Sequence, residues 1–127
     1  MSPRISIPQL TSRDRRALRT HVLEELIRLD DQVTSLSRSF DDIVDGAELT
    51  STDDEHDPEG STIAFERALV SSLLRQAIDD RTAMRLASDR IGEIGYGVCE
   101  NCTDFIGVER LLALPSALRC IACARAM

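Results

Sequence analysis

Residues 12–46 read SRDRRALRTHVLEELIRLDDQVTSLSRSFDDIVDG, and the spacing of their apolar side chains decides the fold. The apolar positions follow one another at intervals of three or four: Leu18, Val22, Leu26, Leu29, Val33, Leu36, Phe40 and Ile43. Because an α-helix completes a turn in about 3.6 residues, these side chains form one stripe along a single helix. The stretch predicts a helix over residues 12–45, opened by a capping box at Thr11 and Asp14 and closed by Gly46.

A second apolar stripe occupies the stretch that ends near Gly92. Its side chains repeat every seven residues, at Ile63, Val70, Ala77, Met84 and Ile91, with Leu73, Leu74 and Ala87 beside them. Asp57-Pro58-Glu59 is typical of a helix start, because Pro suits the first helical position and acids stabilise the positive helix end. Two helices of similar length joined by a loop of about 12 residues close as an antiparallel hairpin. The hairpin is expected to be about 50 Å long, and the same stripes also permit a homodimer of two hairpins.

The composition agrees with a mostly α fold, a long antiparallel two-helix coiled-coil hairpin. The chain has 127 residues, and aromatic residues make up 3% of them with no Trp. So few bulky residues argue against an all-β sandwich or barrel. No apolar run reaches the ~18 residues that cross a bilayer, and residues 1–10 contain Pro3 and Pro8 rather than a signal sequence. We therefore expect a cytoplasmic protein with no membrane segment.

The excess negative charge is concentrated in one segment. The formal net charge is −7, from 22 acidic and 15 basic residues, and every basic residue is Arg. Seven of the acids and none of the bases lie between Asp45 and Thr62, so the rest of the chain is neutral overall. The candidate partner-binding residues in this segment are Asp53, Asp54, Glu55, Asp57 and Glu59. Such a field favours a basic or metal-bearing partner and disfavours a phosphate backbone, although a solvated loop without a partner has the same composition.

Four cysteines form two pairs of matching spacing. Two residues separate Cys99 from Cys102 and Cys120 from Cys123, and 17 residues lie between the pairs. This spacing is typical of a structural zinc site, in which four thiolates surround Zn²⁺ and leave no position open for a substrate. Two disulfides or a redox-active pair are alternatives, but a cytoplasmic chain disfavours stable disulfides and a redox pair needs a βαβ setting. We predict one structural Zn²⁺.

These features divide the chain into three parts. An irregular arm covers residues 1–10, the hairpin covers 11–94 with an acidic tip at 46–60, and a small C-terminal four-cysteine zinc-finger lobe covers 95–127. A short helix is expected from Glu109 to Leu114, ended by Pro115. The lobe has little apolar area, so we expect zinc binding to supply its folding free energy. Seven of its side chains are available to pack on the helix ends: Phe105, Ile106, Val108, Leu111, Leu112, Leu114 and Leu118.

A hairpin followed by YGVCENC at 96–102 and RLLALPSALRCIAC at 110–123 resembles the DksA/TraR family of bacterial transcription factors. The resemblance covers roughly residues 12–125 and is most specific in the finger. It implies a regulator that binds RNA polymerase and inserts the tip of the coiled coil through the secondary channel towards the catalytic Mg²⁺. We further expect a monomer that does not bind a specific DNA sequence.

The chain departs from this family at the tip. Family members carry an Asp-x-x-Asp-x-Ala tip, whereas here Asp57 alone matches in one alignment, and Asp54 and Asp57 match without the Ala in another. A response to guanosine tetraphosphate would need basic groups near the base of the hairpin. Arg81, Arg85 and Arg90 are the candidates, and we interpret them as solvated helix charges.

Two other functions agree with the same features. One is a zinc-stabilised helical adaptor whose partner binds the heptad faces, and the other is a zinc–thiolate redox sensor with an accessible, reactive thiolate. A divalent cation held by His56 and the acids around it is a weaker hypothesis. The sequence contains no Gly-rich phosphate loop, Ser/His/Asp set or Cys/His nucleophile pattern, so we do not expect an enzyme.

Overall fold

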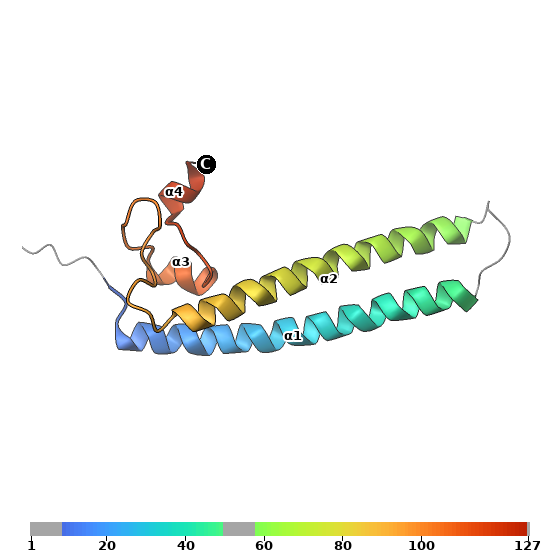
Figure 1. Ribbon diagram of the computed structural model, residues 1–127, viewed down its shortest axis with the longest axis horizontal. Helices are drawn as coiled ribbons and strands as arrows, with labels where there is room; N and C mark the ends of the chain where they lie inside the picture. Colours follow the sequence, from blue (N-terminus) through green and yellow to red (C-terminus); the bar gives the residue numbers. More distant parts are fainter. Residues whose placement is uncertain (1–8, 50–57, 127) are drawn as a thin grey trace, which may run out of the picture. The chain divides into compact units, whose positions relative to one another are not determined.

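The computed structural model describes residues 9–49 and 58–126, and side chains over 9–46 and 60–126 (Figure 1). Its elements are α1 (Ser12–Leu49), α2 (Pro58–Arg90), α3 (Val108–Ala113) and α4 (Ile121–Arg125). The long helices α1 and α2 pack together, so the predicted mostly helical fold is confirmed. Over these residues, extended pairing is confined to one isolated antiparallel bridge, between Val98 and Phe105.

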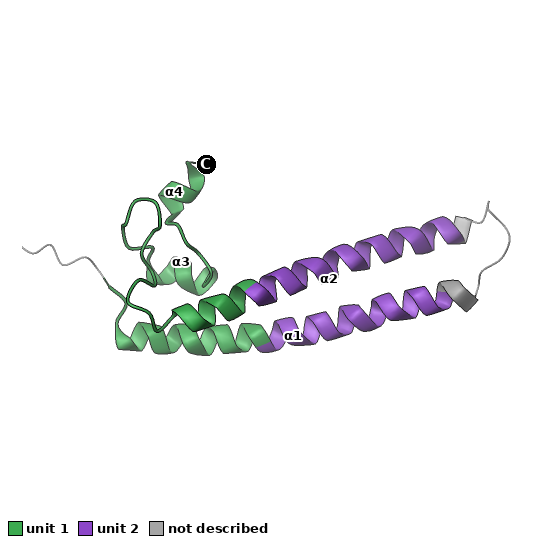
Figure 2. Cartoon of the chain, viewed as in Figure 1, with its two compact units in different colours: residues 1–26, 83–127 green, residues 27–82 purple. Residues whose placement is uncertain are grey.

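The chain divides into two compact units (Figure 2). Unit 1 comprises Met1–Leu26 and Ala83–Met127, and unit 2 comprises Ile27–Thr82. Unit 1 thus contains the first part of α1, the last part of α2 and the cysteine-bearing segment, while unit 2 contains the remainder of the two long helices. None of the described helices is both long enough and apolar enough to cross a bilayer.

The predicted helix starts are confirmed and one predicted helix end is wrong. The Thr11 N–H donates to Asp14 Oδ2 and the Asp14 N–H donates to Thr11 Oγ1, both over 3.0 Å, which is the expected capping box. Helix α2 begins at Pro58, the position that the Asp-Pro-Glu signal indicated. Helix α1 continues through Gly46 to Leu49, because a glycine costs only about 1 kcal/mol inside a helix and Ala, Glu and Leu follow it.

In unit 2 the two apolar stripes meet along one seam. Leu29 and Ala77 are buried in it, and the other predicted α1 side chains of this unit are half-buried: Val33, Leu36, Phe40 and Ile43. Leu74 is half-buried, whereas Leu73 is 46% exposed, so the prediction that Leu73 supports the stripe is wrong. The reason is geometric, since a seam that repeats at intervals of three and four includes position 74 and leaves position 73 beside it.

A charged pair crosses this seam. Arg81 Nη1 is 3.3 Å from Asp30 Oδ1, which ties α2 to α1 within unit 2. The Arg81 side chain keeps only 24% of its surface exposed. The interpretation of Arg81 as a solvated charge is therefore wrong, because the residue occupies a seam position and pairs across it.

Unit 1 has its own core, built where the helix ends meet the C-terminal segment. Buried side chains from α1 and from the end of α2 pack in one cluster with side chains of the segment 96–117: Leu18, Val22, Ile91, Tyr96, Ile106 and Leu111. The Arg15 guanidinium donates to the carbonyl oxygens of Ile91 and Glu93, so it satisfies carbonyl groups just past the end of α2. Leu114 and Leu118 are exposed, contrary to the expectation that they pack in this core.

Candidate metal centre

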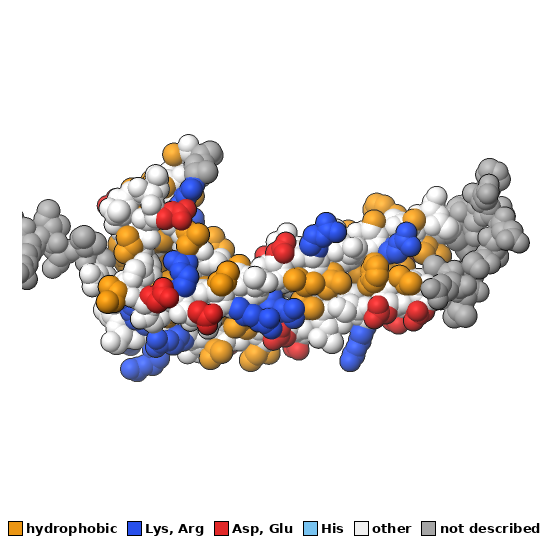
Figure 3. Space-filling model, in the orientation of Figure 1, with side chains coloured by type: hydrophobic (Ala, Val, Ile, Leu, Met, Phe, Trp, Pro, Cys, Tyr) orange, Lys and Arg blue, Asp and Glu red, His pale blue; other side chains and the backbone are white. Residues whose placement is uncertain are grey.

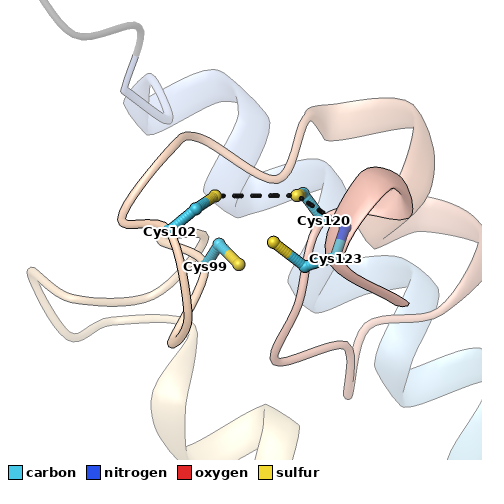
Figure 4. A group of neighbouring side chains, drawn as sticks. All are labelled: Cys99, Cys102, Cys120 and Cys123. Atoms are coloured by element: carbon cyan, nitrogen blue, oxygen red, sulfur yellow. Dashed lines mark hydrogen bonds between the residues drawn. The ribbon is translucent and has the colours of Figure 1, made fainter. Parts of the chain in front are cut away.

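The structure brings the four cysteines together (Figure 4). Cys99 and Cys102 lie in the turn that follows α2, Cys120 precedes α4 and Cys123 lies within it. All four sulfur atoms are within 4.8 Å of one another, and the Sγ atoms of Cys102 and Cys120 are 3.7 Å apart. A zinc ion with Zn–S bonds of ~2.3 Å needs a sulfur tetrahedron with edges of about 3.8 Å. The cluster therefore has the donor set and the size to bind one Zn²⁺.

The first cysteine pair lies on a tight backbone turn. The Cys99 N–H donates to the Asp104 carbonyl over 2.8 Å, and the Thr103 N–H donates to the Cys99 carbonyl over 3.0 Å. Gly97, with φ 90°, and Thr103, with φ 65°, both adopt left-handed backbone conformations. Glycine is favoured there, because a Cβ is strained at positive φ. Thr103 therefore stands at a position that the turn makes unfavourable for a β-branched residue.

The second pair uses the start of a helix. Cys120 is the N-cap residue of α4, and its Sγ accepts a hydrogen bond from the Cys123 N–H over 3.5 Å. The Ala124 N–H donates to the Cys120 carbonyl over 2.9 Å, which closes the first turn. A thiolate at this position is stabilised by the exposed N–H groups of the helix start.

Contacts between the two pairs were not predicted from the sequence. The Glu100 N–H donates to the Leu118 carbonyl over 2.8 Å, and Arg119 Nε donates to Glu100 Oε1 over 2.9 Å. Asn101 Nδ2 donates to Cys123 Sγ over 3.3 Å. The two residues inside the first Cys-x-x-Cys turn thus both contact the segment that carries the second pair. In the sequence, the polarity of Glu100 and Asn101 indicates that they form hydrogen bonds, but only the fold shows which groups are their partners.

The thiols of the first pair have opposite pKa shifts. Backbone hydrogen bonds from Cys102 and Cys120 lower the pKa of Cys99 to about 6, although desolvation opposes the shift. For Cys102, a backbone hydrogen bond from Asp104 lowers the pKa, but desolvation and the neighbouring thiols of Cys99, Cys123 and Cys120 raise it to about 12. Four thiols this close cannot all ionise without a compensating cation. A bound divalent metal would replace their protons.

Tyr96 ties the first cysteine turn to the rest of unit 1. Its side chain is buried, its hydroxyl donates to the Pro115 carbonyl over 2.8 Å, and the Arg90 guanidinium lies 5.8 Å from the ring centroid. Burial raises the pKa of the Tyr96 hydroxyl, despite the lowering effect of the Arg90 and Arg15 charges. The ring thus connects the end of α2 to the segment that leads to Cys120.

We expect Tyr96→Phe to lower the free energy of unfolding by about 1–2 kcal/mol, because the buried Pro115 carbonyl loses its donor. Thermal unfolding of the zinc-loaded protein measures this. In the parent, the stabilisation from the Tyr96 hydroxyl is complete below about pH 10, where this hydroxyl is protonated in both the folded and the unfolded chain. The stabilisation is lost as the pH rises through the higher pKa that Tyr96 has in the folded protein. The stability gap between parent and variant should therefore narrow in alkaline buffer. A gap that is zero at neutral pH would contradict the role of the hydroxyl.

The acidic tip is not placed by the structure. Asp53, Asp54, Glu55 and Asp57 lie outside the described residues. Glu59 belongs to the first turn of α2, but its side chain also lies outside the described part. His56 of the weaker cation hypothesis lies in the same undescribed stretch. A role for these residues therefore stays a prediction from the sequence.

The helical pair and the cysteine cluster together define a C4-type zinc-finger protein built on two long helices. Residues 94–127 match the family model described as the prokaryotic dksA/traR C4-type zinc finger. This match supports the DksA/TraR resemblance predicted from the sequence and places it in the finger. No curated protein sequence matches the chain significantly.

A comparison with solved structures agrees with the fold. The chain is similar to transcription factor DksA2 from Pseudomonas aeruginosa, with a TM-score of 0.76 and 19% sequence identity. The match covers 94% of this chain and 88% of that one. At 19% sequence identity, this similarity is a similarity of fold alone.

Proposed function

We propose that the protein is a zinc-containing transcription regulator that binds RNA polymerase, with its acidic tip inserted into the secondary channel. The observation that carries this proposal is the combination of a DksA/TraR-type finger at 94–127 with two long helices and an acidic segment, residues 45–62, that holds seven acids and no Arg or Lys. A regulator of this kind is expected in the cytoplasm as a monomer. Such a regulator does not have to bind a specific DNA sequence itself. The net charge of −7 agrees with this, because negative charge disfavours binding to DNA phosphates.

In this proposal the cysteine cluster has a structural role. Cys99, Cys102, Cys120 and Cys123 are the ligands of one Zn²⁺ and occupy all four of its positions. The ion therefore stabilises the lobe at 95–127 and has no free position at which to activate water or a substrate. The proposed activity is regulatory and not enzymatic.

The helical pair has the properties that an inserted probe requires. The described part of unit 2 consists of two helices held by a buried seam and by the pair of Arg81 with Asp30, so it is narrow and has no third layer. The segment 50–57 connects the two helices and contains Asp53, Asp54, Glu55 and Asp57. A concentrated negative charge at such a connection suits a target lined with basic groups and metal ions.

Copurification tests the proposal directly. The tagged full-length protein, expressed in its native host, should retain RNA polymerase core subunits on the affinity resin at moderate ionic strength. A variant in which Asp54 and Asp57 are changed to Arg should retain much less. Equal retention by the two proteins, or no polymerase with either, would count against the proposal.

One observation favours the adaptor as a second candidate. Phe65, Leu69 and Leu73 follow one another at intervals of four on the outer face of α2 and are 69%, 49% and 46% exposed. Figure 3 shows hydrophobic side chains at the surface of this part of the chain. An apolar helix face is a common docking surface for a protein partner. If partner binding is lost in Leu69→Ser and Leu73→Ser but not in the tip variant, the adaptor is the better description.

A further inference from the structure

Asn101 lies inside the first Cys-x-x-Cys turn and reaches a sulfur atom of the second pair. Its Nδ2 donates a hydrogen bond to Cys123 Sγ over 3.3 Å. A thiolate sulfur only accepts hydrogen bonds, so the carboxamide has to present its NH₂ group to this atom. Asn101 is therefore a non-cysteine residue whose side chain is hydrogen-bonded to one of the four candidate ligands.

The contact joins the two halves of the site. Cys123 belongs to α4, whereas Asn101 belongs to the turn between Cys99 and Cys102. Other contacts between the two halves are the bonds of Glu100 with Leu118 and Arg119 and the sulfur–sulfur contact of Cys102 with Cys120, but the Asn101 bond reaches a candidate ligand atom directly. A donor from one pair to a ligand of the other resists the first step of metal release, in which one sulfur moves away from the ion.

The neighbouring residue holds the Asn101 backbone where this contact is possible. The Glu100 N–H donates to the Leu118 carbonyl over 2.8 Å, and the Glu100 carboxylate accepts from Arg119 over 2.9 Å. These two bonds fix the turn against the residues that lead into Cys120. The position of the Asn101 carboxamide therefore follows from a backbone held at the preceding residue.

The chemistry of a metal thiolate explains what the contact does. A hydrogen bond to a coordinating sulfur stabilises its negative charge and orients its lone pairs, so the sulfur is harder to protonate and to displace. Asn101 is exposed and Cys123 is half-buried, so water and a competing chelator can approach this edge of the site. An amide that is hydrogen-bonded to this sulfur stabilises a ligand at an accessible edge of the site.

We propose that Asn101 is a positioning residue of the zinc site, which holds Cys123 as a ligand and slows the release of zinc. The inference rests on the proposed zinc ligation and not on polymerase binding. It predicts that the finger keeps its metal against a competing chelator longer than the four cysteines alone would allow.

The test is the rate at which the full-length, zinc-loaded protein gives up its metal to a chromogenic chelator in excess. Asn101→Leu has nearly the same size but no donor, and we expect release about 10-fold faster, the lower end of the range for groups that orient metal ligands. Thr103→Val is the matched control, because the Thr103 hydroxyl donates to the Cys102 carbonyl over 2.6 Å and not to a sulfur. Release from this control should stay within about twofold of the parent.

Asn101→Asp keeps the shape and polarity but has no donor. It should release zinc at least as fast as Asn101→Leu, and Asn101→Gln, which keeps the NH₂ group, should recover part of the difference. Release from the Leu and Asp variants at the parent's rate would overturn the inference. A parent protein that carries no zinc would instead overturn the proposed ligation, so the two failures are distinguishable. Circular dichroism of each variant verifies that the helices are intact before the rates are compared.

Discussion

Replacing Cys120 by serine is expected to abolish stable zinc binding and to unfold much of the segment 95–127. A serine hydroxyl does not ionise near neutral pH, so the site loses one thiolate and with it the closed tetrahedral set. Zinc binding contributes about 10–16 kcal/mol in small zinc-finger peptides, and this segment is of similar size. Cys120 also caps α4 through its side chain, and serine is a good N-cap residue, so the change removes the thiolate but keeps a side-chain acceptor at the helix start. Metal analysis after dialysis and thermal unfolding measure the two effects.

The control for this experiment is Ala122→Ser, which adds the same hydroxyl at an exposed position between the two cysteines of the pair. It should keep one zinc per chain and unfold with the parent. The seam of unit 2 includes no cysteine, so circular dichroism should still show substantial helix in Cys120→Ser. A Cys120→Ser protein with full zinc content and the parent's melting temperature would show that the cluster is not the metal site.

Neutralising the tip should have the second large effect. With Asp53, Asp54 and Asp57 changed to Asn and Glu55 to Gln, we expect polymerase affinity to fall by at least about tenfold at low ionic strength. The loss follows from removing four like charges that would face basic groups, and it should shrink as salt screens the parent's attraction. Binding titrations at two salt concentrations, beside a transcription assay, measure the change.

A control with the same change of net charge separates this local effect from a general one. Asp41, Asp42, Glu66 and Asp79 are exposed acids on the long helices of unit 2, and their neutral amide variants together also remove four charges. This control should bind polymerase with close to the parent's affinity. If both sets of changes weaken binding equally, the tip has no special role and only the total charge matters.

The sequence predicted the features that depend on periodicity and on local signals. The stripe from Leu18 to Ile43 is buried or half-buried along its whole length, and the signals at Thr11 and Pro58 mark helix starts correctly. The short helix predicted at 109–114 is observed as α3, shifted by one residue. These predictions succeed because neighbouring residues on one helix determine them, whatever the rest of the chain does.

The errors have a different physical origin. Gly46 does not end α1, because the free-energy cost of a glycine in the helix is smaller than the free energy gained by continuing the helix to Leu49. The identity of one residue does not reveal which of the two free energies is larger. Leu73 and Leu118 are apolar yet exposed, because burial depends on the neighbour that each side chain meets and not on hydrophobicity alone.

Contacts between distant residues were also out of reach of sequence reasoning. Arg15 reaches the end of α2 across 76 positions of the chain, and Asn101 reaches Cys123 across 22. Spacing rules describe residues within one helix or turn, so they identify the four cysteines but not the groups around them. The cysteine cluster was predictable, whereas the polar contacts that orient it required the fold.

Site-specific photo-crosslinking from position 57 in a complex with RNA polymerase tests the central claim most directly. With a photoreactive residue in place of Asp57, the account predicts crosslinks to polymerase segments that line the secondary channel near the catalytic Mg²⁺. The same probe at the exposed position Arg125 in the finger should give none of these products. Crosslinks from position 57 that fall only on the outer surface of the polymerase, or none at all in a complex that forms normally, would contradict insertion of the acidic segment.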